Sequence, residues 1–509
     1  MLRTMMEPII HFGIETEYGI TRDGEEDLDV VAESIALVRS AMAPGVRMKW
    51  DYDSEDPHAD VRGFKVDELR QDYDEANYFA QDAQRELTFT EIKSDLALSN
   101  GARFYNDHAH PEYCTPECAT LDEIVTHDRA GERIVMDCAE RLSEQRGDTV
   151  RIYKNNTDFR GHSYGCHENY LLPRSLPWED LVRGVEAFLV TRQIFCGAGK
   201  FAMEAEDQFL SPRFQIAQRS DFFQVQQSVD TMQKRPLINT RDEPHADPDK
   251  WRRFHVIIGD ANMSPFVTRL KVGTMALLLE ALVRNPQLEL PQVVAPLDTL
   301  KAVSWDRDFQ WELTMGDRSR STAVEVQRKI LDSVQQACPL DHPDHEWTVR
   351  EWARVLDDLE TDYLRCADRL DWVAKQNLIR EFQKAQGLED DDPWLQSLDL
   401  EYHRLDRDEG LYFSLEDSGA MQSVLVENEV QAAQKLPPES TRAFIRGKCI
   451  ERFGDKVLAA QWDHVILQGA NYDIKISLLD LFAPETIVRY REAIEKAENP
   501  DHLKLILNS

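Results

Sequence analysis

The sequence predicts an α+β fold, in which an antiparallel sheet is backed by long helices and followed by a small C-terminal domain. Apolar and polar residues alternate from Ile9 to Ile20, which is the pattern of a half-buried strand. Further strand candidates follow before residue 260, and helical periodicity prevails over residues 268–386. The end region, which contains Pro437-Pro438, has helix and strand patterns of its own. We therefore expect a large domain over residues 1–430 and a small domain over residues 431–509.

The composition narrows the possible function classes. The chain has 509 residues, of which 42% are hydrophobic and 30% are charged, as in a folded soluble protein. It has no run of about 20 apolar residues and no signal-peptide pattern, so we expect a cytoplasmic protein without a membrane segment. A net charge of −34 would repel nucleic acid and anionic membranes. The eight cysteines include no C-x-x-C pair, which favours reduced thiols.

The strand candidate at residues 9–20 carries two acidic side chains on one face. Glu15 and Glu17 are two residues apart, so on a strand they project side by side. Two such carboxylates either lie in water or share a cation. The flanking Gly13 and Gly19 leave room for a ligand such as a metal bound to phosphate. From this stretch alone, a solvated strand face and a metal site are both open.

A second strand candidate spans residues 100–113. It places Arg103, Tyr105 and Asp107 on one face. Pro111 is expected to end the ladder or to lie on an edge, because proline has no backbone N–H to donate. The acidic residue next to it, Glu112, is a further candidate ligand.

Two more strand candidates carry histidines. His167 lies in the first, at residues 163–172, and His255 lies in the second, at residues 252–260. A single histidine in such a strand is more often a core residue than a ligand. The polar faces of all four strand candidates would nevertheless line one side of an antiparallel sheet. Carboxylates and imidazoles without a thiolate suit Mg²⁺ or Mn²⁺ with a nucleotide phosphate better than structural zinc.

Two segments between these candidates have different patterns. The connection at about residues 50–99 is long and weakly periodic, which is typical of a disordered segment or of a lid over a site. After it, Thr120 and Glu123 form a capping-box pattern at the start of a helix that runs to about Gln145, with Gly147 just past its end.

Several long motifs resemble the family of the Pup ligase and the Pup deamidase/depupylase, and the match extends over nearly the whole chain. They lie at residues 13–19, 100–118, 154–156, 164–170, 238–247 and 255–262. The resemblance implies a glutamine synthetase-like fold, in which a curved antiparallel sheet forms a cradle and a small C-terminal domain closes over a nucleotide. It also implies action on Pup, or on a Pup-like modifier, which marks proteins for the proteasome through their lysines.

The resemblance further implies cofactors and residue roles. The implied cofactors are ATP, or ADP with phosphate, and Mg²⁺, with Mn²⁺ as an alternative. The implied metal ligands are Glu15, Tyr105, Glu112, His167 and His255, with Glu17 nearby. The implied contacts to nucleotide, phosphate or glutamate are Arg103, Thr115, Arg219, Arg241 and Trp462, although surface positions would also explain Arg219 and Arg241. Asp107 matches the catalytic aspartate, which either attacks the substrate or activates water.

Within the family, the sequence favours the hydrolase over the ligase. The motif at residues 107–113 and the long connection are similar to the deamidase, whereas residues 13–17 and Cys166 are similar to the ligase. We therefore expect an amidohydrolase that deamidates the C-terminal glutamine of the modifier and cleaves its isopeptide bond to lysine. A Pup–protein ligase of the same family is the alternative.

Two hypotheses from other classes remain open. His108 and His110 could be ligands of a zinc amidohydrolase, although no third or fourth ligand lies at a recognised spacing. The chain could also bind the modifier without carrying out chemistry.

Overall fold

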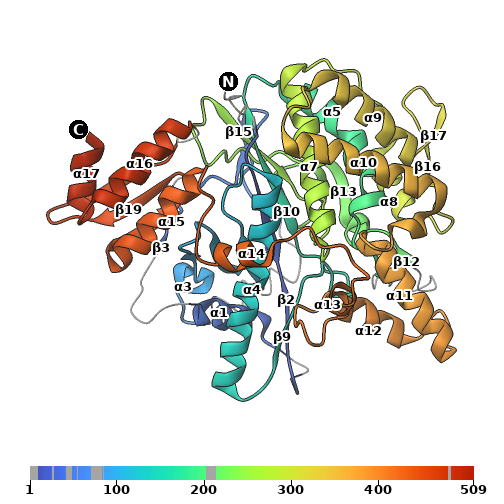
Figure 1. Ribbon diagram of the computed structural model, residues 1–509, viewed down its shortest axis with the longest axis horizontal. Helices are drawn as coiled ribbons and strands as arrows, with labels where there is room; N and C mark the ends of the chain where they lie inside the picture. Colours follow the sequence, from blue (N-terminus) through green and yellow to red (C-terminus); the bar gives the residue numbers. More distant parts are fainter. Residues whose placement is uncertain are drawn as a thin grey trace.

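The computed structural model describes residues 10–25, 28–41, 49–53, 55–69, 83, 85–201, 214–479 and 483–508 (Figure 1). Within these ranges, the centre of the molecule is a six-stranded antiparallel sheet. Its strands lie in the order β15 (Trp251–Val256), β10 (Cys166–Pro173), β1 (Phe12–Glu17), β8 (His110–Cys114), β7 (Arg103–Asp107) and β6 (Leu96–Ala97). The single strand predicted over residues 9–20 is divided in the structure, because β1 ends at Glu17 and a separate strand, β2 (Gly19–Arg22), pairs with β9 (Val150–Tyr153) in another sheet. The predicted antiparallel sheet is confirmed.

The hairpin formed by β7 and β8 corrects one expectation. The sequence predicts a single strand over residues 100–113 that ends at Pro111, but the structure has two strands joined by a turn in which His108 has a φ of +54°. Pro111 lies inside β8, opposite Asn106 of β7. Because the ladder between β8 and β1 starts at Glu112, the missing N–H of Pro111 leaves that ladder intact.

Helices α4 (Leu121–Arg146) and α7 (Pro265–Arg284) pack against the apolar face of the sheet. Helix α4 approaches β8 so closely that a Cβ atom on Gly131 would lie 2.3 Å from the ring of Tyr113. Both the capping box and the C-terminal glycine that the sequence predicts for α4 are present. The opposite, polar face of the sheet is therefore the face available for a site.

Most of the other helices lie to the right in Figure 1. They are α5 (Trp178–Thr191), α6 (Gln193–Cys196), α8 (Pro296–Trp305), α9 (Ala323–Ala337), α10 (Pro343–Asp362), α11 (Asp371–Gln386), α12 (Pro393–Tyr402) and α13 (Leu411–Asp417), whereas α14 (Glu427–Ala433) packs against α4 at the centre. Short strands connect them: β11 (Lys200–Phe201), β12 (Phe214–Gln215), β13 (Phe223–Ser228), β14 (Arg235–Asn239), β16 (Glu312–Thr314) and β17 (Arg320–Thr322). None of the helices in the described ranges combines the length and the apolar composition that a bilayer crossing requires.

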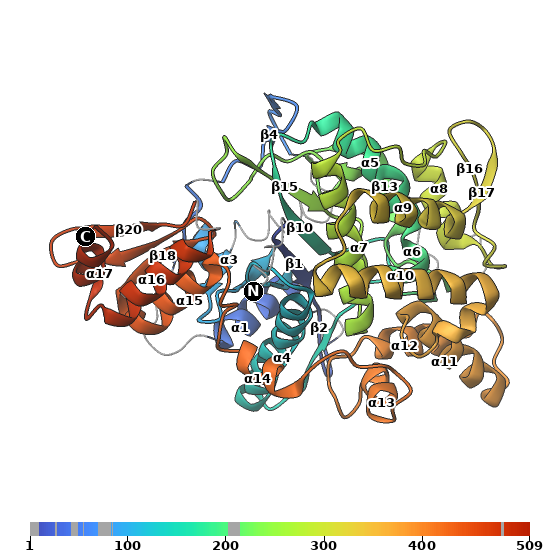
Figure 2. The same ribbon diagram turned by 45° about the horizontal axis from the view of Figure 1, so that its top comes forward.

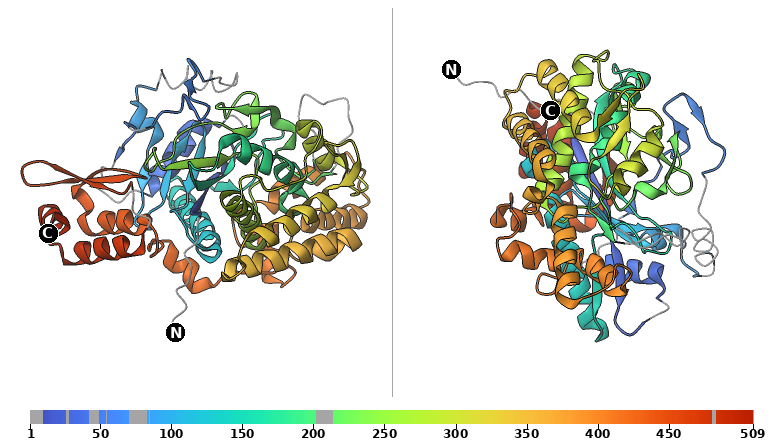
Figure 3. Two further views of the ribbon diagram at one scale, coloured as in Figure 1. Left: turned by 90° about the horizontal axis from the view of Figure 1, so that it is seen from above. Right: turned by 90° about the vertical axis from the view of Figure 1, so that its right-hand side faces the viewer.

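The C-terminal part lies at the opposite end of the molecule (Figures 1 and 3). It consists of α15 (Arg442–Phe453), β18 (Val457–Gln461), β19 (His464–Gln468), β20 (Asp473–Ser477), α16 (Pro484–Lys496) and α17 (Pro500–Asn508), around an apolar core of its own. Glu117, which follows β8, forms ion pairs with Arg442 and Arg446 of α15. These ion pairs hold the C-terminal part against the central sheet, while the boundary at residues 430 and 431 stays a prediction.

The connection predicted at about residues 50–99 contains several short elements. They are β3 (Lys49–Trp50), β4 (Ala59–Asp60), β5 (Phe64–Lys65) and α3 (Phe89–Lys93), after which β6 joins the central sheet. Strand β3 pairs with β18 and so extends the C-terminal sheet, and the β4–β5 hairpin projects at the top of Figure 2. Residues 54, 70–82 and 84 of this connection lie outside the described residues.

Two elements precede the connection. Strand β2 (Gly19–Arg22) pairs with β9 (Val150–Tyr153), and helix α1 (Val30–Ser40) follows β2.

Candidate active site

The register of the central sheet brings the predicted acidic and imidazole side chains onto one face. Glu15 of β1 lies opposite His167 of β10, and Glu17 lies opposite Glu112 of β8. His255 lies on β15, one strand beyond β10. Residues that lie opposite each other in antiparallel strands point to the same face. The structure thus gathers these side chains, while their roles stay predictions.

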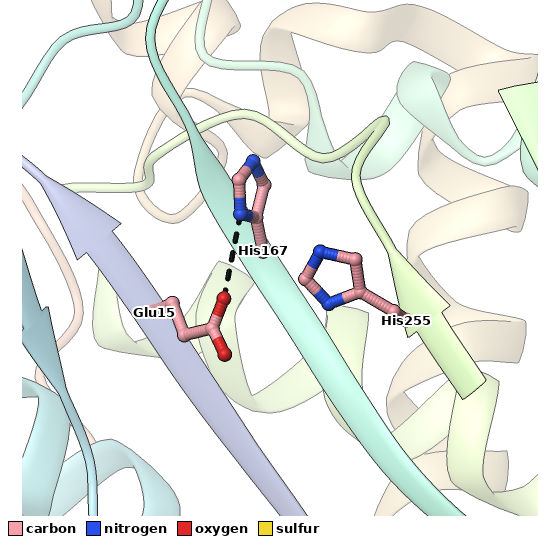
Figure 4. Close-up of side chains that lie close together, drawn as sticks. All are labelled: Glu15, His167 and His255. Atoms are coloured by element: carbon pink, nitrogen blue, oxygen red, sulfur yellow. Dashed lines mark ion pairs between the residues drawn. The ribbon is translucent and has the colours of Figure 1, made fainter. Parts of the chain in front are cut away.

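Glu15, His167 and His255 form the first group, whose ligand atoms lie within 4.8 Å of one another. Figure 4 shows the three side chains on β1, β10 and β15 pointing toward one another. Nδ1 of His167 lies 3.4 Å from Oε2 of Glu15. One carboxylate and two imidazoles converging from three strands could hold a divalent metal ion.

Asn169 and Arg253, which are not among the predicted site residues, support this group. Asn169 donates from Nδ2 to Oε1 of Glu15 (3.0 Å), and its Oδ1 lies 2.9 Å from Nδ1 of His255. When Nδ1 of His255 carries the proton, the lone pair of its Nε2 is available to bind a metal ion. Nη1 of Arg253 donates to Oδ1 of Asn169 (3.0 Å) and lies 3.6 Å from Glu15. Each of these residues is two positions from a predicted histidine, and this period of two is the signal that could have identified them.

The surroundings of the first group favour an ionised carboxylate on Glu15 and a neutral imidazole on His255. Burial opposes ionisation of Glu15, but the hydrogen bond with His167 and the charge of Arg253 lower its pKa. Burial, together with Arg253, holds the pKa of His255 well below its usual value. Metal ligation requires an anionic carboxylate and a neutral imidazole, so both groups have the form that a metal ion needs.

Glu17, Asp107 and Glu112 form the second group of potential ligands. Tyr105 donates its hydroxyl hydrogen to Oε1 of Glu112 (2.9 Å). Burial and the neighbouring carboxylates of Asp107, Glu15 and Glu17 raise the pKa of Glu112 well above its usual value. A divalent cation between these carboxylates would neutralise their repulsion. The donor set therefore fits a hard, oxygen-preferring cation such as Mg²⁺.

Asp107, the predicted catalytic carboxylate, is held from one side by Lys93 and His108. Nζ of Lys93 lies 2.6 Å from its Oδ1, and Nδ1 of His108 lies 3.2 Å from the same oxygen. Burial raises the pKa of Asp107, but His108 and Lys93 outweigh burial and lower the pKa well below its usual value. Asp107 is therefore an anion at neutral pH. Lys93 lies in the weakly patterned connection, where no local sequence pattern predicts a site residue.

Two cavities lie on either side of the paired groups. The first has a volume of about 80 Å³, and Glu15, Thr115 and Trp462 are among its lining residues. The second has a volume of about 680 Å³, and its lining residues include Glu17, Asp107, His167 and Arg219. The two groups of potential ligands thus border a cavity next to the C-terminal part and a larger one lined by β2.

The five residues expected to contact nucleotide, phosphate or glutamate do not gather at one place. Thr115 and Trp462 share the smaller cavity, and Arg219 lines the larger one. Arg103 is buried, donates to Asp95 from Nε and Nη2 (2.9 and 2.6 Å), and stacks over the ring of Tyr105 at 3.7 Å.

Arg219 is fully buried, the side chain of Arg241 is 18% exposed, and desolvation lowers the pKa of both guanidinium groups. Burial and the neighbouring Arg235 lower the pKa of Arg219 to about 10. Arg241 lies between the connection and the site, because Asp60 of β4 forms a β-bridge with it and its Nη1 lies 4.0 Å from Glu243. The guanidinium groups therefore lie inside the protein, in contrast to the surface positions that the sequence left open.

The zinc hypothesis finds no support in the geometry. In the described ranges, neither His108 nor His110 belongs to a group of three or more His, Cys, Asp or Glu side chains close enough to share an ion. His110 instead stacks on Tyr164, with ring centroids 4.3 Å apart, and its Nδ1 lies 3.2 Å from the carbonyl of Tyr18.

Comparison with known proteins agrees with the sequence motifs. The family model described as "Pup-ligase protein" matches residues 11–466. A protein of Acidothermus cellulolyticus named "Depupylase" is 42% identical over 472 residues, which cover 89% of this chain and 90% of that relative. "Pup–protein ligase 1" of Rhodococcus erythropolis is 38% identical over 366 residues, which cover 70% of this chain and 80% of that relative.

Two solved structures have the same fold. The crystal structure of a complex between the prokaryotic ubiquitin-like protein Pup and its ligase PafA matches with a TM-score of 0.77 and 27% identity, over 99% of this chain and 95% of that chain. The structure of PafA in complex with ADP matches with a TM-score of 0.72 and 30% identity, over 86% of this chain and 96% of that chain. With a family model that covers most of its length, the chain belongs to the Pup-ligase protein family.

Proposed function

We propose that the protein is an ATP- and Mg²⁺-dependent amidohydrolase that deamidates the C-terminal glutamine of Pup, or of a Pup-like modifier, and cleaves the isopeptide bond between the modifier and lysine. The main observation in favour of this function is that two groups of potential metal ligands lie on one face of the sheet, with the anionic Asp107 beside the larger cavity. Such a site can bind a metal with phosphate on one side and an amide substrate on the other.

The comparisons support the hydrolase over the ligase. The similarity to the depupylase extends over 89% of the chain, whereas the ligase of Rhodococcus erythropolis matches 70% of it. The connection at residues 50–99 also contributes Lys93 and Asp95 to the site, which fits an element that belongs to the activity.

The residues of the site divide into roles by what they can hold. We assign the metal, Mg²⁺ with Mn²⁺ as an alternative, to Glu15, Glu17, Tyr105, Glu112, His167 and His255. We assign contacts with nucleotide, phosphate or the modifier's glutamate end to Arg103, Thr115, Arg219, Arg241 and Trp462, and the similarity to an ADP-bound ligase supports a nucleotide site. When bound, ATP with its metal supplies positive charge and phosphate beside the scissile amide.

The chain's own residues explain how an amide could react there. Asp107 is an anion whose pKa lies well below its usual value, so it can attack the amide carbon or orient and deprotonate water during the reaction. Arg219 lines the same cavity and can stabilise the negative charge that develops on the amide oxygen.

A reducing, cytoplasmic location and a place in the proteasome pathway are part of this proposal. All eight cysteines lie in the described ranges, buried and without disulfides, which supports a reducing compartment. Pup is the partner of the similar ligase PafA, and we propose that Pup, or a relative of Pup, is also the partner of this chain.

One experiment tests the function directly. The protein is incubated with ATP, Mg²⁺, a modifier that ends in glutamine and a preformed modifier–protein conjugate, and both substrates are followed by mass spectrometry. We expect conversion of the terminal glutamine to glutamate and release of the unmodified protein. Formation of new conjugates without deamidation would identify a ligase, and no change in either substrate would leave only modifier binding.

A further inference from the structure

Lys93 occupies one side of the predicted catalytic carboxylate. It is the last residue of α3, its side chain is only 15% exposed, and its Nζ lies 2.6 Å from Oδ1 of Asp107. The same ammonium lies over the ring of Tyr105, 5.5 Å from its centroid. A lysine held this way presents to Asp107 the same group that the side chain of a lysine from another protein would present.

The backbone around Lys93 is held on both sides, so the contact is built into the fold. Asn106, the neighbour of Asp107, donates from its side chain to the carbonyl of Ile92 (3.1 Å). On the other side, Asp95 forms an ion pair with Arg103 at 2.6 Å. These two anchors fix the backbone on either side of Lys93 next to β7, which places the lysine side chain within reach of Asp107.

Asp107 can activate a nucleophile only within hydrogen-bond distance of its carboxylate oxygens. Lys93 and His108 both contact Oδ1, so an amine that approached this oxygen would have to displace the largely shielded ammonium of Lys93. A water molecule is smaller and carries no charge, and the Asp107 side chain is 23% exposed and lines the larger cavity, so water can reach the carboxylate beside the ammonium. We propose, on the basis of the function above, that Lys93 excludes external amines from Asp107 and so restricts the enzyme to water as the acceptor of the modifier's acyl group.

The two competing reactions differ only in the acceptor. In hydrolysis, the C–N bond of the terminal glutamine amide breaks, a C–O bond to water forms, and ammonia leaves with one proton from that water. In aminolysis, the same C–N bond breaks, a C–N bond to a neutral amine forms, and ammonia leaves with one proton from the amine. Both reactions balance without another reactant, so the ratio of acid to new amide reports which acceptor reaches the site.

Variants at Lys93 test whether this side chain decides between hydrolysis and aminolysis. Lys93→Met keeps a similar volume and removes the charge, which leaves the carboxylate of Asp107 without its ammonium partner and open to an external one. Lys93→Arg keeps a cation at this position. Lys65→Met is the matched control, because Lys65 lies in the same connection, is 70% exposed and pairs with Asp56 away from Asp107.

The experiment supplies each variant with ATP, Mg²⁺, the modifier that ends in glutamine and an excess of n-butylamine, which mimics a lysine side chain. Mass spectrometry measures the ratio of butylamide to acid, and circular dichroism and nucleotide binding establish that each variant is folded. We expect the ratio to rise by about tenfold or more in Lys93→Met, and to stay near the wild-type value in Lys93→Arg and Lys65→Met.

The possible results are distinguishable. An unchanged ratio in a folded, active Lys93→Met variant overturns the proposal. Loss of both products in a folded Lys93→Met variant that binds nucleotide also overturns it, because Lys93 would then be needed for the reaction itself. If the wild-type protein forms neither acid nor butylamide, the proposed amidohydrolase function fails, and the role of Lys93 falls with it.

Discussion

The backbone of Gly165 lies directly against the imidazole of His167: a Cβ atom on Gly165 would lie 2.2 Å from Nε2 of His167 and 2.8 Å from Oε1 of Glu17. A methyl group there must displace one side chain from each group of potential ligands. We predict that Gly165→Ala weakens Mn²⁺ binding, measured by calorimetry, by about tenfold or more. Its unfolding midpoint should change little, because both displaced groups are side-chain ends.

A matched control for this substitution is Gly316→Ala in the turn between β16 and β17, where the nearest atom to an added Cβ is Cβ of Gln292 at 3.2 Å. This variant should bind Mn²⁺ as the wild type does. Equal affinities of the Gly165→Ala variant and the wild type would show that His167 and Glu17 do not hold the metal.

Nucleotide binding should depend on a divalent metal. Without a cation, the carboxylates of Glu15, Glu17 and Asp107 would face the phosphates of ATP and repel them. We predict that EDTA weakens ATP binding strongly and that Glu15→Ala weakens it in the presence of Mg²⁺ and abolishes turnover. Fluorescence titration with an ATP analogue measures this, and unchanged affinity in EDTA would contradict the metal assignment.

The contact between the C-terminal part and the sheet should depend on pH. Burial opposes the charge of Glu117, but Arg446 and Arg442 lower its pKa from 4.5 to about 2. A carboxyl group whose pKa is lower in the folded state stabilises the fold above the unfolded-state value, and this stabilisation is lost as the pH falls from about 4.5 toward 2. Glu117→Gln should cost on the order of 3 kcal/mol at neutral pH, because it leaves buried arginines without their partner.

Urea unfolding at several pH values measures this effect. The difference in unfolding free energy between the wild type and Glu117→Gln should be constant near neutral pH and should shrink in acid. A difference that stays the same down to the lowest pH would mean that the charge of Glu117 is not what stabilises this contact.

The strands of the site could be predicted from the sequence because each has a local pattern. The period of two in β1, β10 and β15 assigns Glu15, His167 and His255 to the polar faces of their strands. What brings Glu15 opposite His167 is the pairing of β1 with β10, which lie about 150 residues apart in the chain. A single strand carries no information about this register, so the gathering of the ligands needed the family resemblance or the structure.

The connection at residues 50–99 could not be predicted in the same way. Strands of two residues, such as β3 and β4, have no periodicity, and their positions depend on the distant segments with which they pair. Lys93 ends a helix of only five residues, and its contact with Asp107 depends on the packing of α3 against β7. Neither the charge of Lys93 nor its neighbours distinguish it from a surface lysine.

The last prediction concerns Asp107 itself. Asp107→Asn keeps the shape of the side chain and removes its charge and basicity, so turnover should fall by about 10²-fold or more whether Asp107 attacks the amide or activates water. Because the metal is assigned to other side chains, ATP and the modifier should bind within a few-fold of the wild type, which assigns the loss to the transition state.

Rapid quenching followed by mass spectrometry of the wild type distinguishes the two roles, since only a nucleophile forms a covalent adduct between the modifier and Asp107. Near-normal turnover of Asp107→Asn, with conversion of the introduced asparagine back to aspartate ruled out by mass, would remove this residue from the mechanism and make Glu17 the next carboxylate to test.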